Sequence, residues 1–263
     1  MAINKILGKN MINFYRAGIL CVIMLIPATV WATHPFDVDD TATEGKGNFL
    51  FELTGVYAKD ASLKSTTETA FLTVGASEHT DISLEVPYLL LDPSPVTGEN
   101  ASGKGDVRLK FKQQIFENEV RQSMAYEIYT DMPTGDVKKG LGTNNVVWGA
   151  KLVDTQECHN NAFHLNVGYE VYGRDMKKWH YGTNYDIRFG LAAEHKYTES
   201  FRVLAEITGE HGEFAGKRFN PYRFLAGVIY DISKSWYVDL GAQVGLNKDA
   251  EDHSILAGTA WRF

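Results

Sequence analysis

The feature that most constrains the fold is an alternation of apolar and polar residues that recurs along most of the chain. It is clearest over residues 81–90, where every second residue is apolar: Ile82, Leu84, Val86, Tyr88 and Leu90. Residues 162–172 and 236–246 follow the same pattern. A period of two places successive side chains on opposite sides of a β-strand, so each segment predicts a strand with one apolar and one polar face.

About twelve such segments follow one another at a spacing of about eighteen residues. The predicted strands are near 47–59, 66–78, 81–91, 104–116, 121–131, 143–155, 161–172, 182–197, 200–210, 221–232, 235–247 and 253–263. Many reach the roughly nine to eleven residues that a tilted strand needs to cross a bilayer, and bacterial single-chain barrels have an even number of strands. The predicted fold class is therefore all-β, an antiparallel transmembrane β-barrel.

The connections between these strands support the same fold. Those after the even-numbered strands are tight, at 78–80, 117–120, 198–199 and 233–234, with a slightly longer one at 156–161. Those after the odd-numbered strands are longer and polar, at 60–65, 92–103, 132–142, 173–181 and 210–220. Short periplasmic turns and long outer loops are typical of outer-membrane barrels, so both termini are predicted on the periplasmic side.

The N-terminal stretch predicts a signal peptide, residues 1–32. Three bases with no nearby acid precede an apolar run over 17–30, and small residues stand at Val30 and Ala32, which favours cleavage after Ala32. A short membrane anchor is the alternative, but the run is too short to span a bilayer comfortably. Removing these three bases and no acids changes the formal net charge from −7 to −10, which makes nucleic acid a poor partner.

The mature chain then divides into a periplasmic N-terminal segment, 33–46, and a barrel, 47–263. Residues His34, Asp37, Asp39 and Asp40 of the segment could bind a cation, but their spacing matches no calcium loop. A flexible acidic leader, or one tucked into the periplasmic mouth, is the favoured interpretation, and no metal or cofactor is expected. Cys158 is the one cysteine left after cleavage, which excludes an internal disulfide.

The two faces of the strands predict what lies outside and inside. The apolar face has aromatic residues near strand ends, where membrane interfaces lie: Tyr88, Trp148, Tyr185, Tyr230, Trp236, Trp261 and Phe263. A soluble sandwich or lipocalin-like barrel would instead pack this face on a core. The signal peptide, the aromatic residues and the mid-strand charges favour a barrel in the outer membrane of a Gram-negative bacterium, surrounded by lipid and monomeric by default.

The polar face would line the lumen. The candidate lumen residues are Glu52, Glu85, Arg108, Lys110, Lys112, Glu127, Lys151, Glu170, Asp186, Arg188, Glu194, Arg202, Glu206, Arg223 and Asp239. They could stiffen the wall by cross-strand ion pairs, or they could form a charge-lined path that selects solutes. We place the hypothetical constriction at Arg108, Lys110 and Lys112, facing acids. Twelve strands predict a narrow bore, constricted by loops or by the N-terminal segment.

Several stretches resemble a known family. They are THPFDVDDTATEGKGNFLFEL (33–53), TDISLEVPYLLL (80–91), GKGDVRLKFK (103–112), MPTGDVKKGLGTNN (132–145) and SILAGTAWRF (254–263). Together they resemble the transporter-like barrels labelled as a "MetA-pathway of phenol degradation" family. The resemblance covers most of the mature chain, and it implies an outer-membrane location and the movement of small, aromatic compounds.

An acyl-modifying barrel enzyme is the least favoured class. GxSxG, HExxH and a phosphate loop are absent, and the adjacent His253 and Ser254 would point to opposite faces. The prediction is therefore a channel-like barrel, not an enzyme, for passive passage of small solutes. The alternative is a non-conducting barrel that acts as a structural or ligand-binding wall. Conductance separates these two classes.

Overall fold

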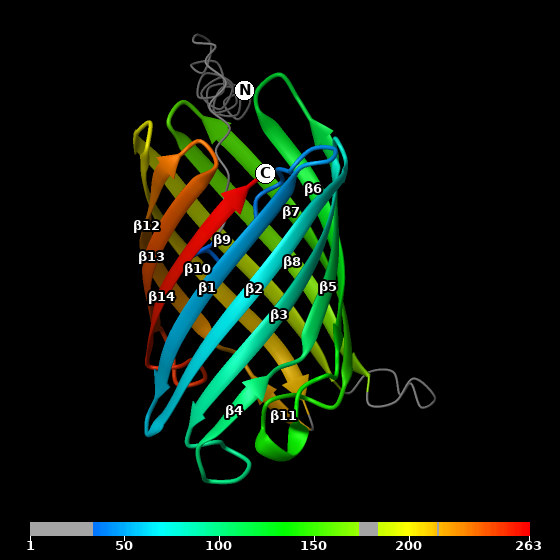
Figure 1. The fold of residues 1–263 in the computed structure, drawn as a ribbon, viewed down its shortest axis with the longest axis vertical. Helices are drawn as coiled ribbons and strands as arrows, with labels where there is room; N and C mark the ends of the chain where they lie inside the picture. The colour runs from blue at the N-terminus through cyan, green and yellow to red at the C-terminus, as the bar shows by residue number, and fades with distance from the viewer. Residues whose placement is uncertain (1–33, 174–183, 215) are drawn as a thin grey trace, which may run out of the picture.

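The fold is a closed β-barrel (Figure 1), seen in a computed structural model that describes residues 34–173, 184–214 and 216–263. Twelve long strands form the barrel wall, as predicted, and two short strands and one 3-10 turn lie in the connections at one end. The strands are β1 Phe49–Asp60, β2 Leu63–Ser77, β3 Thr80–Asp92, β4 Ala101–Lys104, β5 Val107–Glu117, β6 Gln122–Met132, β7 Val146–Cys158, β8 Asn161–Gly173, β9 Tyr185–Thr198, β10 Phe201–Phe214, β11 Lys217–Phe219, β12 Tyr222–Ser233, β13 Trp236–Gly245 and β14 His253–Arg262, and the turn is η1 Val137–Lys139. No helix in the described part of the chain is long and apolar enough to cross a membrane.

The first and last strands close the ring. Strand β14 pairs with β1 from Leu50 opposite Arg262 to Lys59 opposite His253. Beyond this ladder, the backbones of Phe49 and Phe263 exchange hydrogen bonds of 2.9 and 3.1 Å. Closure gives every long strand two neighbours, which removes the unpaired edges that neither water-soluble sheets nor lipid tolerate well.

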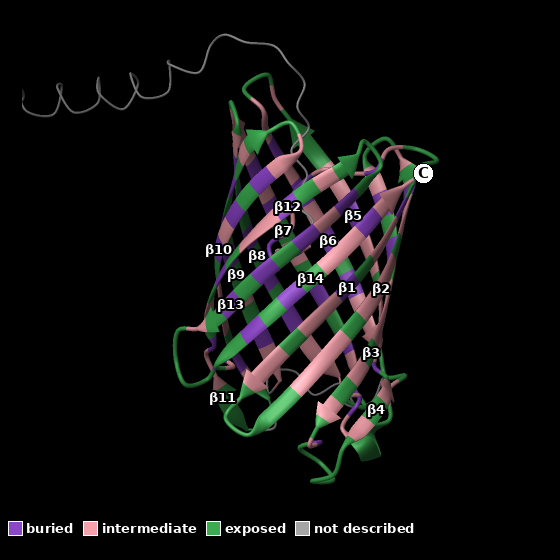
Figure 2. Cartoon of the chain, turned by 60° about the vertical axis from the view of Figure 1, so that its left-hand side comes forward, coloured by how far each residue is buried: buried purple, intermediate pink, exposed green. Residues whose placement is uncertain are grey.

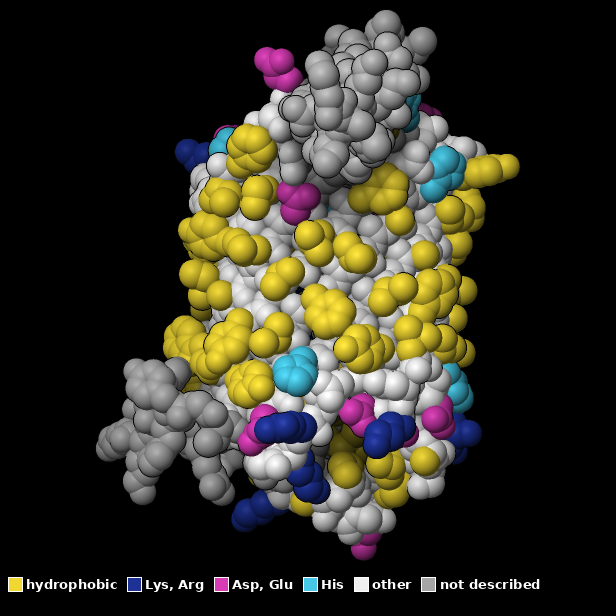
Figure 3. Space-filling view, turned by 180° about the vertical axis from the view of Figure 1, so that it is seen from behind, with side chains coloured by type: hydrophobic (Ala, Val, Ile, Leu, Met, Phe, Trp, Pro, Cys, Tyr) yellow, Lys and Arg dark blue, Asp and Glu magenta, His cyan; other side chains and the backbone are white. Residues whose placement is uncertain are grey.

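The barrel wall is apolar outside and polar inside. Leu152, Leu191 and Leu240 are 55%, 61% and 54% exposed, whereas Glu127 and Asp186 are fully buried. Hydrophobic side chains form a broad band on the outer face, and charged side chains gather near one end of the barrel (Figure 3). The exposed and buried residues alternate along each strand (Figure 2). An apolar belt of this kind would be costly in water and is favourable in hydrocarbon, so the chain is an outer-membrane barrel and not a soluble sandwich.

The two ends of the barrel differ. One end, which we call the turn end, has the short connection between β2 and β3, the short connection between β5 and β6 (residues 118–121) and the C-terminus. The other end, which we call the loop end, has β4, η1 and β11 (Figure 1). The prediction of a long connection at 60–65 is wrong, because β1 and β2 are joined by residues 61–62 alone. Residues 63–65 are mostly polar, so they lack the alternation signal although their backbone continues the ladder.

The predicted strand 104–116 is interrupted. It corresponds to β5, and Gly105 and Asp106 separate β5 from β4. The short strands β4 and β11 lie almost entirely in the connections predicted at 92–103 and 210–220. The Asp106 carboxylate accepts hydrogen bonds from the backbone N–H groups of Gly135 and Thr143, at 2.9 and 2.8 Å. The interruption therefore anchors the long connection between β6 and β7, because it frees one carboxylate to hold that loop.

Candidate functional site

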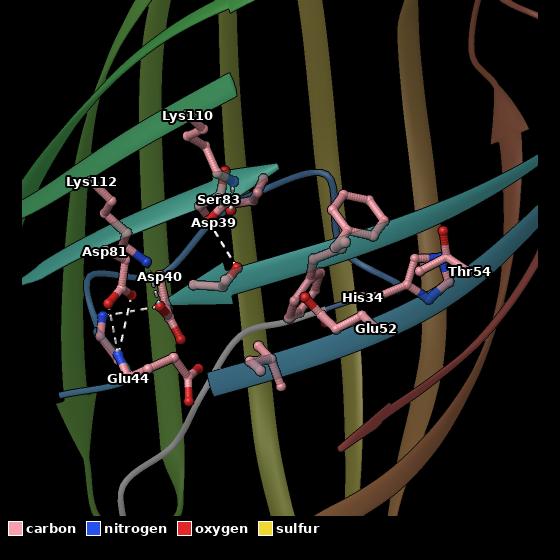
Figure 4. Close-up of a pocket in the computed structure, with 16 residues that line it drawn as sticks. His34, Asp39, Asp40, Glu44, Glu52, Thr54, Asp81, Ser83, Lys110 and Lys112 are labelled. Carbon is pink, nitrogen blue, oxygen red and sulfur yellow. Dashed lines mark hydrogen bonds and ion pairs between the residues drawn. The ribbon is translucent and has the colours of Figure 1, made fainter. Parts of the chain in front are cut away.

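Residues 34–48, which we call the lumen segment, run from inside the barrel to its rim at the turn end, where residues 46–48 are exposed (Figures 1 and 4). The segment enters β1 directly, so it is the part of the chain that immediately precedes the wall. Pro35, Val38, Asp40 and Thr41 are buried within the barrel. Of the interpretations of residues 33–46, the described part therefore agrees with a tucked segment and not with a free leader.

Wall side chains satisfy the backbone of the segment. The Glu206 carboxylate on β10 accepts hydrogen bonds from the N–H groups of Asp37 and Val38, all at 3.1 Å. The Asn166 amide on β8 accepts from the N–H of Asp39 and donates to its carbonyl, both at 2.8 Å. Buried backbone groups need such partners, so these side chains fix the path of an otherwise irregular stretch.

Further bonds carry the segment across the lumen. His34 Nδ1 lies 2.5 Å from the Asp239 carboxylate on β13, and the N–H of Thr41 donates to the Thr155 hydroxyl on β7 at 3.2 Å. The N–H of Glu44 donates to both oxygens of Asp81 on β3, at 3.1 Å. The segment thus crosses the inside of the barrel from β13 to β3.

One part of the segment is held by charge, and we call it the charged anchor. Lys112 Nζ lies 3.1 Å from the Asp40 carboxylate, and Lys110 Nζ lies 3.7 Å from that of Asp39. Lys151 also pairs with Asp39, and its Nζ is 2.9 Å from Glu127. Lys110 and Lys112 of the predicted constriction therefore face acids, and two of these acids, Asp39 and Asp40, come from the lumen segment rather than from neighbouring strands. That these bases form a constriction stays a prediction.

The other part is held by apolar packing, and we call it the apolar anchor. Phe36 packs against a cluster inside the barrel formed by Leu50, Leu204, Leu225, Ile229, Tyr237, Leu256 and Ala260. Val38 lies over Gly190 of β9, where an added Cβ would come within 2.4 Å of a Val38 methyl group. A side chain at position 190 would push the segment away, so this glycine is explained by close approach.

A small cavity remains beside the segment (Figure 4). Its volume is about 140 Å³, and the wall side chains Glu52, Thr54, Thr73, Ser83 and Lys110 line it together with the segment. Carboxylates, hydroxyls and ammonium groups face this space, so it suits water and small polar solutes.

The loop-end half of the lumen is lined by three arginines, Arg108, Arg188 and Arg223. Arg108 Nε lies 2.6 Å from Asp131, and its guanidinium stacks 4.4 Å from the Tyr129 ring. The other pairs are Arg188 with Asp186 at 2.7 Å and Glu170 at 3.0 Å, and Arg223 with Glu210 at 2.6 Å and Glu251 at 2.8 Å. Each arginine faces more than one carboxylate, because Arg108 also approaches Glu170 at 3.7 Å.

The remaining predicted lumen residues also lie inside the barrel with partners. Glu52 accepts a hydrogen bond from the Tyr237 hydroxyl at 2.9 Å. Arg202 lies 3.5 Å from Glu194 and 3.1 Å from Asp231, and Lys110 lies 3.6 Å from Glu85 across the β3–β5 ladder. That these residues line a conducting path stays a prediction.

Acids outnumber bases among the charged groups inside the barrel. The segment brings Asp37, Asp39, Asp40 and Glu44, against His34 and Lys46, and Lys46 is exposed at the rim. The wall acids are Glu52, Asp81, Glu85, Glu127, Asp131, Glu170, Asp186, Glu194, Glu206, Glu210, Asp231, Asp239 and Glu251, whereas the bases are Arg108, Lys110, Lys112, Lys151, Arg188, Arg202, Arg223 and Arg262. The described lumen therefore has a negative formal balance.

Glu44 closes the segment at the rim of the barrel. Its carboxylate lies 3.2 Å from the Arg262 guanidinium. Burial raises the pKa of the Glu44 carboxyl, and the nearby Arg262 charge opposes this rise. Docking the segment thus costs this carboxylate part of its hydration.

Sequence reasoning missed the partners that hold the segment, chiefly Asn166, Thr155 and Asp81. Their signal was weak, because short polar residues on the inner parity of a barrel are ordinary. Gly190 carried a usable signal, since a mid-strand glycine on the inner face indicates a close approach by another backbone or ligand. Combined with unpaired lysines on the wall and four acids in the preceding segment, it could have indicated a docked N-terminus.

The geometry offers little for catalysis or metal binding. His253 is exposed and Ser254 is buried, with its hydroxyl 3.5 Å from Glu251, so the two side chains point to opposite faces. In the ranges that the structure describes, no three His, Cys, Asp or Glu side chains are grouped as a metal site requires. His34, Asp39 and Asp40 face separate partners instead.

Comparisons with known proteins agree with this geometry. The family described as "Putative MetA-pathway of phenol degradation" matches residues 32–263. Among solved structures, the COG4313 outer membrane channel from Pseudomonas putida F1 superposes with a TM-score of 0.71 at 13% identity, covering 88% of this chain and 100% of that one. The NanC porin (0.56, 11%, 80% and 98%) and the KdgM porin (0.55, 9%, 81% and 99%) are also similar. No curated protein sequence matches the chain.

Proposed function

Since the chain belongs to the family described as "Putative MetA-pathway of phenol degradation", we propose that it is a narrow outer-membrane channel through which small solutes diffuse past a docked lumen segment. The observation that carries the proposal is the cavity of about 140 Å³ left between the segment and the wall, whose lining is part charged and polar and part apolar, with Phe36, Leu50 and Phe71. Charges of both signs face it, which allows water and solute to pass without a dry barrier. The proposal includes no catalytic step.

The orientation follows from the loops. We place the turn end in the periplasm and the loop end outside, because outer-membrane barrels have short periplasmic turns and longer outer loops. The N-terminal residues 1–32 act as a signal peptide in this proposal, and the mature chain functions as a monomer. The lumen segment then restricts the periplasmic half of the path, and the three arginines lie in the outer half.

The charge balance indicates the solute class. An acid-rich lumen repels anions and favours cations and neutral molecules. The family description points to phenols, whose hydroxyl has a pKa near that of tyrosine, about 10, so they are neutral at pH 7. We therefore propose neutral, phenol-like aromatic compounds as solutes, and we expect aromatic carboxylates to pass more slowly.

Single-channel recording of the mature chain in planar bilayers tests the channel. We expect small, steady openings with a preference for cations, and larger conductance when residues 34–42 are deleted. Silence of both proteins, with the folded barrel verified, would contradict the proposal. Liposome swelling with phenol, benzoate and a sugar of similar mass tests the solute class, and faster entry of benzoate would overturn it.

A second candidate function is a non-conducting barrel. The observation that favours it is the number of hydrogen bonds that the wall makes to the segment, from His34 to Glu44. A silent wild-type protein whose deletion variant conducts would select this candidate. Steady wild-type openings would select the channel.

A further inference from the structure

Two basic residues face each other where β1 and β2 meet, and this hairpin lies at the loop end (Figure 1). Lys59 and Lys64 lie directly opposite each other in the β1–β2 ladder, and His253 lies opposite Lys59 on the other side. Their parity is that of Tyr57 and Tyr88, which are 38% and 45% exposed on the outer surface. The two lysines, which we call the outer basic pair, therefore project from the wall and not into the lumen.

The two like charges of this pair lie side by side. Like charges directly opposite in an antiparallel ladder repel, because their Cβ atoms are only about 4.5–5.5 Å apart. Asp92 is opposite Lys64 on β3, yet neither lysine has a carboxylate within ion-pair distance among the residues that the structure describes. The lumen lysines Lys110 and Lys112, by contrast, each pair with an acid. An anion between the outer lysines would remove the repulsion.

A groove lies directly below the pair on the same face. Its volume is about 380 Å³, and Tyr57, Thr66, Leu90 and Ser102 contribute to its lining, with Lys64 and Asp92 at its loop-end edge. Tyr57 and Thr66 are the next outward residues after the two lysines in the same ladder, toward the turn end. Tyrosines on a barrel mark the level of lipid headgroups, so the groove lies between the lysines and that level.

We propose that the pair and the groove bind a phosphorylated glycolipid of the outer leaflet, with one phosphate between Lys59 and Lys64 and an acyl chain along the groove. The ligand class follows from the position, because a phosphate at headgroup level complements two ammonium groups and an acyl chain complements Leu90 and the Tyr57 ring. Asp92 lies opposite Lys64 on β3 and would repel a phosphate there, so the phosphate binds on the other side of Lys64, between it and Lys59. The inference rests on the proposed orientation, in which the loop end faces outward.

Lipid binding by the full mature chain in zwitterionic detergent tests the proposal, with lipid A that has two phosphates as the probe and native mass spectrometry as the readout. The double variant Lys59→Gln/Lys64→Gln should bind the probe about tenfold more weakly, the order of change expected for two interfacial lysines. The matched control is Lys138→Gln/Lys139→Gln, which removes two exposed charges from η1 at the same end and should bind like the wild type. Dephosphorylated lipid A should bind the wild type as weakly as lipid A binds the double variant.

Other outcomes overturn the proposal. Equal losses in both double variants would indicate nonspecific electrostatics, and unchanged binding would remove the lysines from any site. Displacement of the lipid by millimolar inorganic phosphate would indicate a plain anion site. Heat-modifiable gel migration verifies that the variants fold. Their channel conductance should equal that of the wild type, so a negative result for lipid binding leaves the proposed channel function untouched.

Discussion

The two anchors of the lumen segment hold it by opposite chemistry. The apolar anchor seats Phe36 in a cluster of aliphatic residues from β1, β10, β12, β13 and β14. The charged anchor, a few residues along, pairs Asp39 and Asp40 with lysines of β5 and β7. Apolar burial is indifferent to salt, whereas ion pairs beside water are screened and also create a field. The difference teaches that one anchor only fixes the segment, whereas in the proposed channel the other would also influence which solutes pass.

The largest effect should come from the apolar anchor. Phe36→Ala removes an aromatic ring from packed surroundings, and we expect docking of the segment to lose about 3 kcal/mol. Conductance should rise toward that of the 34–42 deletion, and hydrogen exchange at residues 35–45 should speed up, at low and high salt alike. The matched control is Val96→Ala in an exposed loop, which should leave both measurements unchanged. Unaltered exchange in Phe36→Ala would show that the ring does not hold the segment.

The charged anchor should give a smaller, salt-dependent effect. Lys112→Gln removes the partner of the buried Asp40 carboxylate and should weaken docking by about 2 kcal/mol. Raising the salt concentration should shrink the difference from the wild type, since the wild-type pair is then screened. Asp40→Asn and the double variant complete a cycle measured by the same hydrogen exchange. Strict additivity of the two single changes would mean that the pair contributes no coupling.

The same lysines should tune selectivity. Replacing Arg108, Lys110 and Lys112 with Gln leaves the acids of the lumen unopposed, so the reversal potential in a salt gradient should move further toward cation selectivity. Replacing Lys138 with Gln, on an exposed turn outside the lumen, is the control and should leave the potential in place. An unchanged potential in the triple variant would remove these residues from the path.

The smallest effect concerns pH. Burial raises the pKa of Glu44 above its ordinary value of 4.5, so the docked segment binds the proton more readily than the free one. Docking should therefore strengthen as pH falls through the raised pKa toward 4.5, and weaken as pH rises above it. Glu44→Gln should remove this part of the pH dependence, measured as protection of residues 40–46 from exchange. An identical pH profile in Glu44→Gln and the wild type would contradict this cause.

The strand pattern was predictable because hydrocarbon outside and water inside impose a period of two on the sequence. Residues such as Leu84 and Leu240 on one parity and Glu85 and Asp239 on the other suffice to predict strand number and facing. Boundaries were less predictable, because ladders continue past the membrane into water. There, as at residues 63–65 in β2, nothing requires an apolar residue.

The candidate site was only half predictable. The wall charges, such as Lys112 and Glu127, follow from parity, but parity cannot say which acid a lysine meets. Lys112 meets Asp40, which precedes it by 72 residues and lies on no strand. Irregular segments have no period, and their path depends on many weak contacts made at once.

By itself, the amino-acid sequence determined a closed antiparallel barrel, its number of long strands and the identity of its two faces. The alternation of apolar and polar residues recurs in every long strand, so each strand indicates these properties by itself. Only the tertiary structure decided that the lumen segment enters the bore, that Phe36 and Asp40 hold it by different forces, and that Lys59 and Lys64 lie opposite each other on the outer wall. The physical reason is that these features depend on which residues lie opposite one another in the closed barrel. The strand register and the path of the N-terminal segment determine these neighbours, and neither can be read from the alternation pattern.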